Sequence, residues 1–384
     1  DFNQFLTGNY QQLDVKLGGG SIAHGSGAIG GSVHLQNDFK FRQGWENDAQ
    51  LSYGSFDTYN LQYHTHYSND QLSAQFSFNH YSTENDYPTP NEAGKNLNGE
   101  YKLNQFNLGI TYRFNNFHHL KFISETNFGD RHFSLATPFE MPTKYETWNH
   151  RFLTEWNYQK SSFQSNVKLA YLKEQSDYFA NINSDYFSRL DVDTYVVKYL
   201  AQYAFNPNIK LSFLADYTHN IGEGNSIAKQ ERDILGAGFV FNHRIGNTFS
   251  YDLSVRKEDT KAYQSPLLYS VGLAQQWNES WKTRLHFSKN FRIPTYNDLY
   301  WEASGNPDLK TETSYQYEMG NDLVLGEFGL NWNIFYNDIQ DLIQWIPSGN
   351  GSLWYPVNQE SVKTYGTEFF VNYQWRNLSL SGLF

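Results

Sequence analysis

The 384-residue sequence contains no cysteine, which excludes disulfide bonds and metal sites built on thiolates. No run of about 18 apolar residues occurs, so no transmembrane helix is expected. No signal peptide is recognisable at Asp1, so for an exported protein we expect a processed or trimmed chain. Basic residues are outnumbered, with 29 Lys and Arg against 40 Asp and Glu, and the net charge of −11 argues against nucleic-acid binding.

Apolar residues are also scarce, yet aromatic residues are abundant. The hydrophobic fraction is 39%, below that of usual soluble proteins, while Phe, Trp and Tyr make up 18%. This combination suits a wall with one apolar and one polar face, because half of its side chains must then be polar.

Apolar and polar residues alternate along most of the chain after residue 48. In one window Phe106, Leu108 and Ile110 alternate with Asn107 and Gly109. A period of two predicts β-strands, and no window longer than two turns has the helical period. The apolar set of each strand is expected to face lipid. The polar residues predicted to face the lumen are Gln62, His64, Ser73, Gln75, Asn107, Arg113, Lys198, Asp252, Arg256, Lys282 and Arg284.

The connections between these strands alternate between short and long. Short turns are predicted near residues 68–70, 115–116, 159–160, 206–208, 246–247, 278–279, 326–327 and 376–377. Long polar loops are predicted at 84–103, 130–144, 176–189, 221–231, 259–266, 291–313 and 346–354. Short turns on one rim and long loops on the other are typical of outer-membrane barrels. All ten prolines avoid strand interiors, as this assignment requires.

The sequence therefore predicts an all-β fold, a transmembrane antiparallel β-barrel over residues 48–384. About sixteen or seventeen strands are present. Because such barrels have an even strand count and end on the periplasmic side, we expect a fragment cut at both ends. The alternative is a native terminal strand formed by Leu378, Leu380 and Phe384.

Seven glycines occur in residues 17–35, before the alternation begins. Residues 25–30 fit the dinucleotide-binding pattern G-x-G-x-x-G, but a strand-like stretch follows instead of a helix, so a nucleotide site is not expected. A bent strand-turn-strand in which neighbouring backbone comes close explains the glycines better.

Two segments resemble TonB-dependent outer-membrane receptors. Residues 22–35, IAHGSGAIGGSVHL, resemble the end of that family's plug domain, except that His24 stands where an aromatic such as tyrosine is usual. Residues 291–320 resemble its F-R-x-P, G-N-P-x-L-x-x-E and y-E-x-G signature, with Lys310-Thr311 as a minor departure. The resemblance implies a plug end and linker over residues 1–47, and a barrel of the 22-stranded type. It places Gly25, Gly27, Gly30 and Gly31 at the plug–barrel junction.

The resemblance also implies a function and a location. A receptor of this kind lies in the bacterial outer membrane, in contact with lipid, and takes up a scarce, bulky nutrient such as a ferric siderophore, haem or cobalamin. Energy would come from an inner-membrane TonB complex, through a segment upstream of Asp1. No enzymatic activity, cofactor or nucleic-acid partner is implied. The alternatives are a passive porin, or another barrel protein without energy coupling such as an adhesin or a lipid-modifying enzyme.

Candidate metal sites are weak. His118 and His119 are adjacent, so on a strand they point to opposite faces. His64 and His66 share a face but have no evident carboxylate nearby. Four acidic residues around one outer loop fit either a calcium site or a solvated acidic loop: Asp177, Asp185, Asp191 and Asp193.

The predicted outer loops are rich in aromatic residues and show no arginine cluster. Aromatic side chains suit a large, partly apolar ligand, and the lack of clustered arginine favours a neutral or weakly charged one. The residues predicted to bind it are Trp148, Tyr178, Tyr186, Trp301, Trp345 and Trp354.

Overall fold

The computed structural model describes residues 5–6, 8, 10–37, 39–88, 94–135, 137, 139–225, 227–302, 304–349 and 353–384. Most of them lie in strands, and no helix in these ranges is long and apolar enough to cross a membrane.

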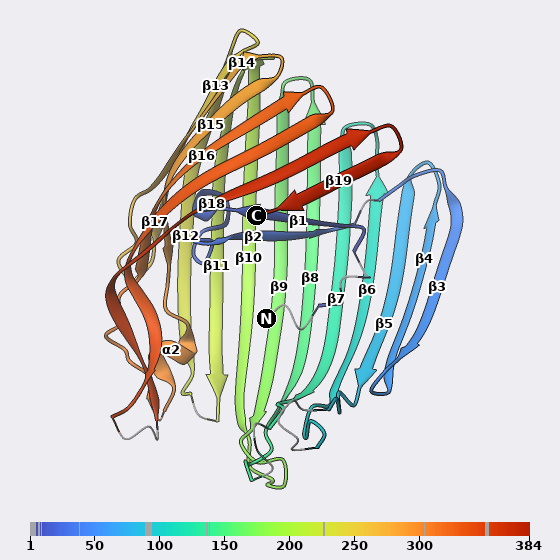
Figure 1. The fold of residues 1–384 in the computed structure, drawn as a ribbon, viewed down its shortest axis with the longest axis vertical. Coiled ribbons are helices and arrows are strands. Elements are labelled where there is room, and N and C mark those ends of the chain that lie inside the picture. The colour runs from blue at the N-terminus through green and yellow to red at the C-terminus, as the bar shows by residue number, and fades with distance from the viewer. Residues whose placement is uncertain are drawn as a thin grey trace.

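Seventeen strands of the described chain form one large antiparallel sheet, called the wall here, in which each strand pairs with the next. They are β3 (Gly44–Gly54), β4 (Thr58–Ser68), β5 (Leu72–Thr83), β6 (Tyr101–Arg113), β7 (His118–His132), β8 (Lys144–Lys160), β9 (Phe163–Phe179), β10 (Ser188–Asn206), β11 (Ile209–Gly224), β12 (Gln230–Ile245), β13 (Phe249–Asp259), β14 (Leu268–Asn278), β15 (Trp281–Arg292), β16 (Glu312–Leu325), β17 (Phe328–Pro347), β18 (Trp354–Trp375) and β19 (Leu378–Leu383). Figure 1 shows the wall curling around an interior, with β18 and β19 crossing in front. The all-β barrel fold is thereby confirmed, while a total of 22 strands stays a prediction.

Every predicted short turn joins two wall strands at the same rim, the upper one in Figure 1. An asparagine opens several of these turns. The side-chain oxygens of Asn69, Asn115 and Asn206 each accept hydrogen bonds from two following backbone N–H groups. This Asx geometry replaces the ladder partners that the backbone loses where the chain reverses. The long connections lie at the opposite rim.

The predicted faces are confirmed where the strands alternate most strictly. On β6, Gln105 and Asn107 are buried, whereas Phe106 and Leu108 are exposed. On β13 the same contrast separates buried Arg256 from exposed Leu253 and Val255. Polar side chains therefore line the interior, and apolar side chains form the outer surface, the arrangement that a barrel in lipid requires.

The N-terminal segment (residues 10–37) lies inside the curve of the wall (Figure 1). It contains the hairpin of β1 (Gln12–Leu17) and β2 (Gly31–Gln36), joined through the short helix α1 (Ser21–His24). α1 contacts β13, β14 and β15, where Ile22 packs with Leu268 and Phe291. β3 begins at Gly44, inside the range 1–47 that we assigned to the plug end and linker, and that division stays a prediction.

Candidate functional site

The N-terminal segment is held to the wall by hydrogen bonds to the end of β15. Ser21 donates its backbone N–H to Asn290 Oδ1 at 3.1 Å, and its hydroxyl accepts from Phe291 N at 3.3 Å. Gly27 donates to the carbonyl of Phe291 at 3.1 Å. Ser21 and Phe291 are fully buried, so these bonds are made away from water, where an unpaired N–H would be costly.

The glycines of this segment have different roles. Gly25 has φ +77°, and a Cβ placed there would lie 2.8 Å from Glu258 Oε1, so both conformation and space require glycine. Gly27 has φ +95° and Gly31 has φ +152°. Gly30 has no positive φ, and no atom lies within 4 Å of the position that a Cβ would take there. The close approach of neighbouring backbone that was expected for these glycines is therefore not found at Gly27 or Gly30.

A charged network lies on the wall beside Gly25. Arg256 donates to Asp216 at 2.6 and 2.9 Å and to Glu258 at 3.1 and 2.9 Å. Tyr263 donates to the other oxygen of Glu258 at 3.1 Å, and burial together with this carboxylate raises the pKa of Tyr263. The guanidinium thus holds two carboxylates at the point where the N-terminal segment meets β13.

α1 also brings a histidine into the lumen. Burial lowers the pKa of His24, and the nearby charges of Lys198 and His34 lower it further, which favours the neutral imidazole. Its ring centroid lies 5.2 Å from that of His34 on β2.

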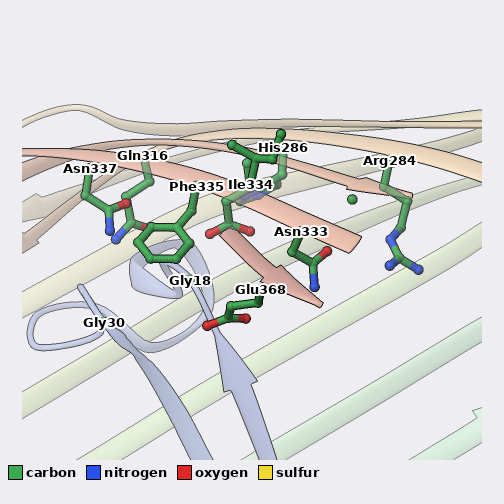
Figure 2. Close-up of a pocket in the computed structure, with 12 residues that line it drawn as sticks. Gly18, Gly30, Arg284, His286, Gln316, Asn333, Ile334, Phe335, Asn337 and Glu368 are labelled. Carbon is green, nitrogen blue, oxygen red and sulfur yellow. The ribbon is translucent and has the colours of Figure 1, made fainter. Parts of the chain in front are cut away.

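Two cavities lie between the N-terminal segment and the wall. The first has a volume of about 440 Å³ and is lined mainly from β15 to β18. Figure 2 shows Gln316, Phe335 and Asn337 over the loop that carries Gly18 and Gly30. The second, of about 580 Å³, lies between β2 and strands β5 to β9.

The connection between β15 and β16 is folded tightly at the long-loop rim. It contains α2 (Tyr296–Tyr300), which Thr295 and Asp298 cap reciprocally, with bonds of 3.1 and 2.9 Å. Asp298 also accepts the indole N–H of Trp345 at 2.9 Å. Tyr296 is buried against β11, where its hydroxyl donates to the carbonyl of Asn220 at 3.2 Å.

The family follows from comparison with known proteins. The model of the family "TonB dependent receptor-like, beta-barrel" matches residues 3–384. This chain belongs to the TonB-dependent receptor family. Its wall is accordingly that of an outer-membrane β-barrel, as predicted.

Relatives and solved structures agree with this assignment. The vitamin B12 transporter BtuB of Vibrio vulnificus (strain YJ016) is 26% identical over 373 residues, which are 93% of this chain and 59% of that protein. BtuB of Photobacterium profundum is 27% identical over 218 residues, 55% of this chain and 35% of that protein. The chain therefore spans less than two thirds of the length of these relatives.

The siderophore receptor PirA from Acinetobacter baumannii has the same fold, with a TM-score of 0.80 at 15% identity, covering 97% of this chain and 66% of that chain. The FrpB iron transporter from Neisseria meningitidis gives a TM-score of 0.80 at 14% identity, covering 96% of this chain and 66% of that chain.

Three of the six predicted ligand-binding residues of the receptor lie in one sector of the rim. Trp301 follows α2 directly, Trp345 lies on β17, and Trp354 is the first residue of β18, opposite Pro347 in the same hairpin. α2 and Trp345 are joined through Asp298.

The other three lie on β8, β9 and the loop that follows. Tyr178 packs against Tyr145 with ring centroids 4.9 Å apart, and Tyr186 is exposed in the loop before β10. Trp148 is 52% exposed and packs edge-on against Phe128, on the outward face that also carries Phe106. A ligand site shared between this group and the first stays a prediction.

The histidine and acidic clusters have partners of their own. His66 shares a hydrogen bond of 2.9 Å with Ser73, and its Nδ1 lies 3.7 Å from a carboxylate oxygen of Glu46. The expectation of no nearby carboxylate was therefore wrong, because pairing of β3 with β4 brings Glu46 opposite His66. Asp177 binds Arg189 through both carboxylate oxygens, at 2.7 and 2.6 Å.

Lys173 lies 4.0 and 3.9 Å from Asp191 and Asp193. In the described part of the chain no three His, Asp or Glu side chains are grouped as a metal ion would need. A calcium site around these aspartates gains no support from this arrangement.

The sequence reasoning missed Asp298, although its signal was present. Thr295 and Asp298 have the spacing of a capping box, which marks the start of a helix. The partner of Asp298, Trp345, lies 47 residues further along the chain and carries no sequence signal of this contact.

Proposed function

We propose that this receptor takes up a scarce, bulky nutrient across the outer membrane, driven by an inner-membrane TonB complex. The observation that supports this is the N-terminal segment inside the wall, bonded to Asn290 and Phe291. A passive porin needs an open lumen, whereas a transporter that is opened by pulling needs an internal plug. We assign the N-terminal segment to the end of that plug, with the TonB-contacting segment upstream.

Cobalamin is our first candidate for the nutrient, because the BtuB relatives are named as vitamin B12 transporters and match 93% of this chain in one case. A ferric siderophore or haem is the alternative. Three arginines near the long-loop rim are already engaged: Arg189 with Asp177, Arg232 with the Pro294 carbonyl, and Arg292 with Glu312. Their engagement supports a neutral or weakly charged ligand over a strongly anionic chelate.

The proposed capture site centres on Trp301, Trp345 and Trp354, with Tyr178 and Tyr186 across the rim. Flat aromatic faces can desolvate a macrocyclic ligand without an opposite charge. Trp148 could contact the ligand only if the outward face of the wall took part in binding. Contact with lipid explains its exposed position on that face more simply.

Uptake by whole cells tests this proposal. The full-length receptor is expressed in a bacterial strain without its own cobalamin and siderophore receptors, and accumulation of radiolabelled cyanocobalamin is followed with and without TonB. We expect accumulation only with TonB, and its loss when a protonophore removes the membrane potential. Equal accumulation without TonB would show a passive pore. Uptake of a ferric siderophore and not of cyanocobalamin would show that the substrate is a siderophore, and the proposal of active transport would still hold.

A further inference from the structure

The two segments that carry the family resemblance touch each other in the folded chain. Ser26 Oγ accepts a hydrogen bond from the backbone N–H of Ile293 at 2.9 Å, across 267 residues of sequence. Gly27 donates to the carbonyl of Phe291 two residues earlier. Ile22 and Phe291 pack in the same buried cluster, with Ile293 against it. The N-terminal segment is thus bonded to the stretch from which the β15–β16 loop departs.

Ile293 lies only two residues before the cap of α2. Pro294 separates it from Thr295, and the fixed φ of proline leaves few free torsions between the Ser26 contact and the helix. The Pro294 carbonyl accepts from both terminal nitrogens of Arg232 at 3.3 Å, which fixes the same stretch from the wall side. The position of Ile293 therefore sets where α2 begins.

α2 in turn positions two aromatic residues of the proposed capture site. Asp298 is buried and accepts the indole N–H of Trp345, while its second oxygen accepts from Thr295 N. Trp301 ends the helix and donates its backbone N–H to the carbonyl of Asn297 at 3.3 Å. A shift of α2 must move Trp301 and release or displace Trp345.

We infer that Ser26 is a positioning residue for ligand capture: its hydroxyl orders α2, and through α2 the side chains of Trp301 and Trp345. This role rests on the proposed function, in which the N-terminal segment is the end of the plug. Coupling of this kind is reciprocal, so a ligand that favours the ordered loop also favours the docked segment. Displacing the segment removes the Ser26 and Gly27 bonds and loosens the loop from inside the barrel.

The wall also holds the β15–β16 loop through bonds that do not involve Ser26. Arg292 binds Glu312 through two bonds of 2.8 Å, and Asn306 donates to the carbonyl of Pro356 at 3.2 Å. If these anchors and the Tyr296 contact were sufficient, the loop would keep its order without Ser26. The inference requires that they are not.

Hydrogen exchange on the full-length receptor tests this directly, without any ligand. In Ser26→Ala the backbone N–H of Ile293 loses its acceptor, and we expect exchange over residues 295–301 to become about tenfold faster. Ser68→Ala is the matched control, because Ser68 Oγ accepts the backbone N–H of Gln43 at 3.1 Å in the same kind of bond, at the other rim. Ser68→Ala should leave residues 295–301 unchanged. Unchanged exchange in Ser26→Ala would overturn the inference.

Two further variants separate the hydroxyl from the shape of the side chain. Ser26→Thr keeps the hydroxyl acceptor, whereas Ser26→Val has nearly the shape of threonine but no hydroxyl. The inference therefore requires normal exchange over residues 295–301 in Ser26→Thr and fast exchange in Ser26→Val. Equal behaviour of the two would assign the effect to packing and overturn the role of the hydroxyl. If Ser26→Ala fails to assemble, this pair carries the test.

A nitroxide at position 308 gives a second readout in the same loop. These 384 residues contain no cysteine, so Asp308→Cys introduces the single cysteine of this part of the receptor, and Asp308 is exposed. The label should become more mobile with Ser26→Val than with Ser26→Thr. Identical spectra would count against the inference. Because no nutrient is needed, failure here leaves the uptake proposal standing, and failure of uptake leaves the ordering of the loop standing.

Discussion

Arg256 shows how single residues fix the junction between the N-terminal segment and the wall. Its side chain is 2% exposed and holds Asp216 and Glu258 at once. Gly236 provides the room for it, since a Cβ there would meet the guanidinium and the Asp216 carboxylate. A buried cation of this kind is tolerated only because both carboxylates and all the bonds are in place.

Replacing Arg256 with methionine should therefore destabilise the receptor strongly. Two buried carboxylates would lose their shared cation, and breaking such a buried pair costs about 3–5 kcal/mol. Denaturant unfolding of the refolded receptor in detergent measures this cost. Arg42→Met is the matched control, because Arg42 pairs with Asp70 while both side chains are about three-quarters exposed, and it should cost less than about 1 kcal/mol. Similar costs for the two variants would mean that the network is not what stabilises the junction.

Gly27 and Gly30 offer a test of backbone conformation alone, because neither has an atom within 4 Å of its Cβ position. Gly27 has φ +95°, so Gly27→Ala should weaken docking of the segment by about 1–2 kcal/mol. Gly30→Ala should change little. Hydrogen exchange over residues 21–30 should be faster only in the first variant, and equal exchange in both would remove conformation as the cause.

At the scale of elements, the sequence predicts the strands well and the docking of the loops poorly. Strict alternation and Asx turns act over two to four residues, so Phe106, Asn107 and Asn115 carry the signal for their own positions. The contact of Ser26 with Ile293 joins residues 267 positions apart and depends on the completed wall. The outward orientation of Trp148 could have been read from its alternation with Asn149, which is buried. Its aromatic character and its nearness to a long loop suggested a ligand contact instead.

The register of β10 can be tested with two adjacent valines that face opposite sides. Val197 is 44% exposed on the outer surface, and Val196 belongs to the inner face with Lys198. Val197→Arg should cost about 2–4 kcal/mol if it lies near the middle of the membrane, and Val196→Arg should cost clearly less. A water-soluble maleimide should reach cysteine at position 198 and miss cysteine at position 199. Labelling of 199 alone would show that the register is shifted by one residue.

At the scale of the whole molecule, the two rims of the wall differ in structure. The rim with short turns is held by local asparagine bonds, and the rim with long loops carries the tightly packed α2 connection and exposed aromatics. The N-terminal segment crosses the interior between them and bonds to the wall just where that connection begins. This arrangement bonds the N-terminal segment to the start of the connection that carries Trp301 of the proposed capture site.

The proposed capture site can be tested by comparing tryptophans at the rim with a tryptophan on the outward face. With cyanocobalamin as the ligand, Trp301→Ala together with Trp354→Ala should weaken binding to the full-length receptor about tenfold or more, because stacking and desolvation by two aromatic faces are lost. Trp148→Ala removes an equally large side chain from the outward face and should leave binding unchanged. Since the contacts are aromatic, the dissociation constant should change less than about tenfold between about 50 and 500 mM salt. Full affinity in the double variant would exclude Trp301 and Trp354 from the binding site. Loss of binding in Trp148→Ala would show that the outward face takes part in binding. A steep salt dependence of the dissociation constant would indicate a cationic pocket.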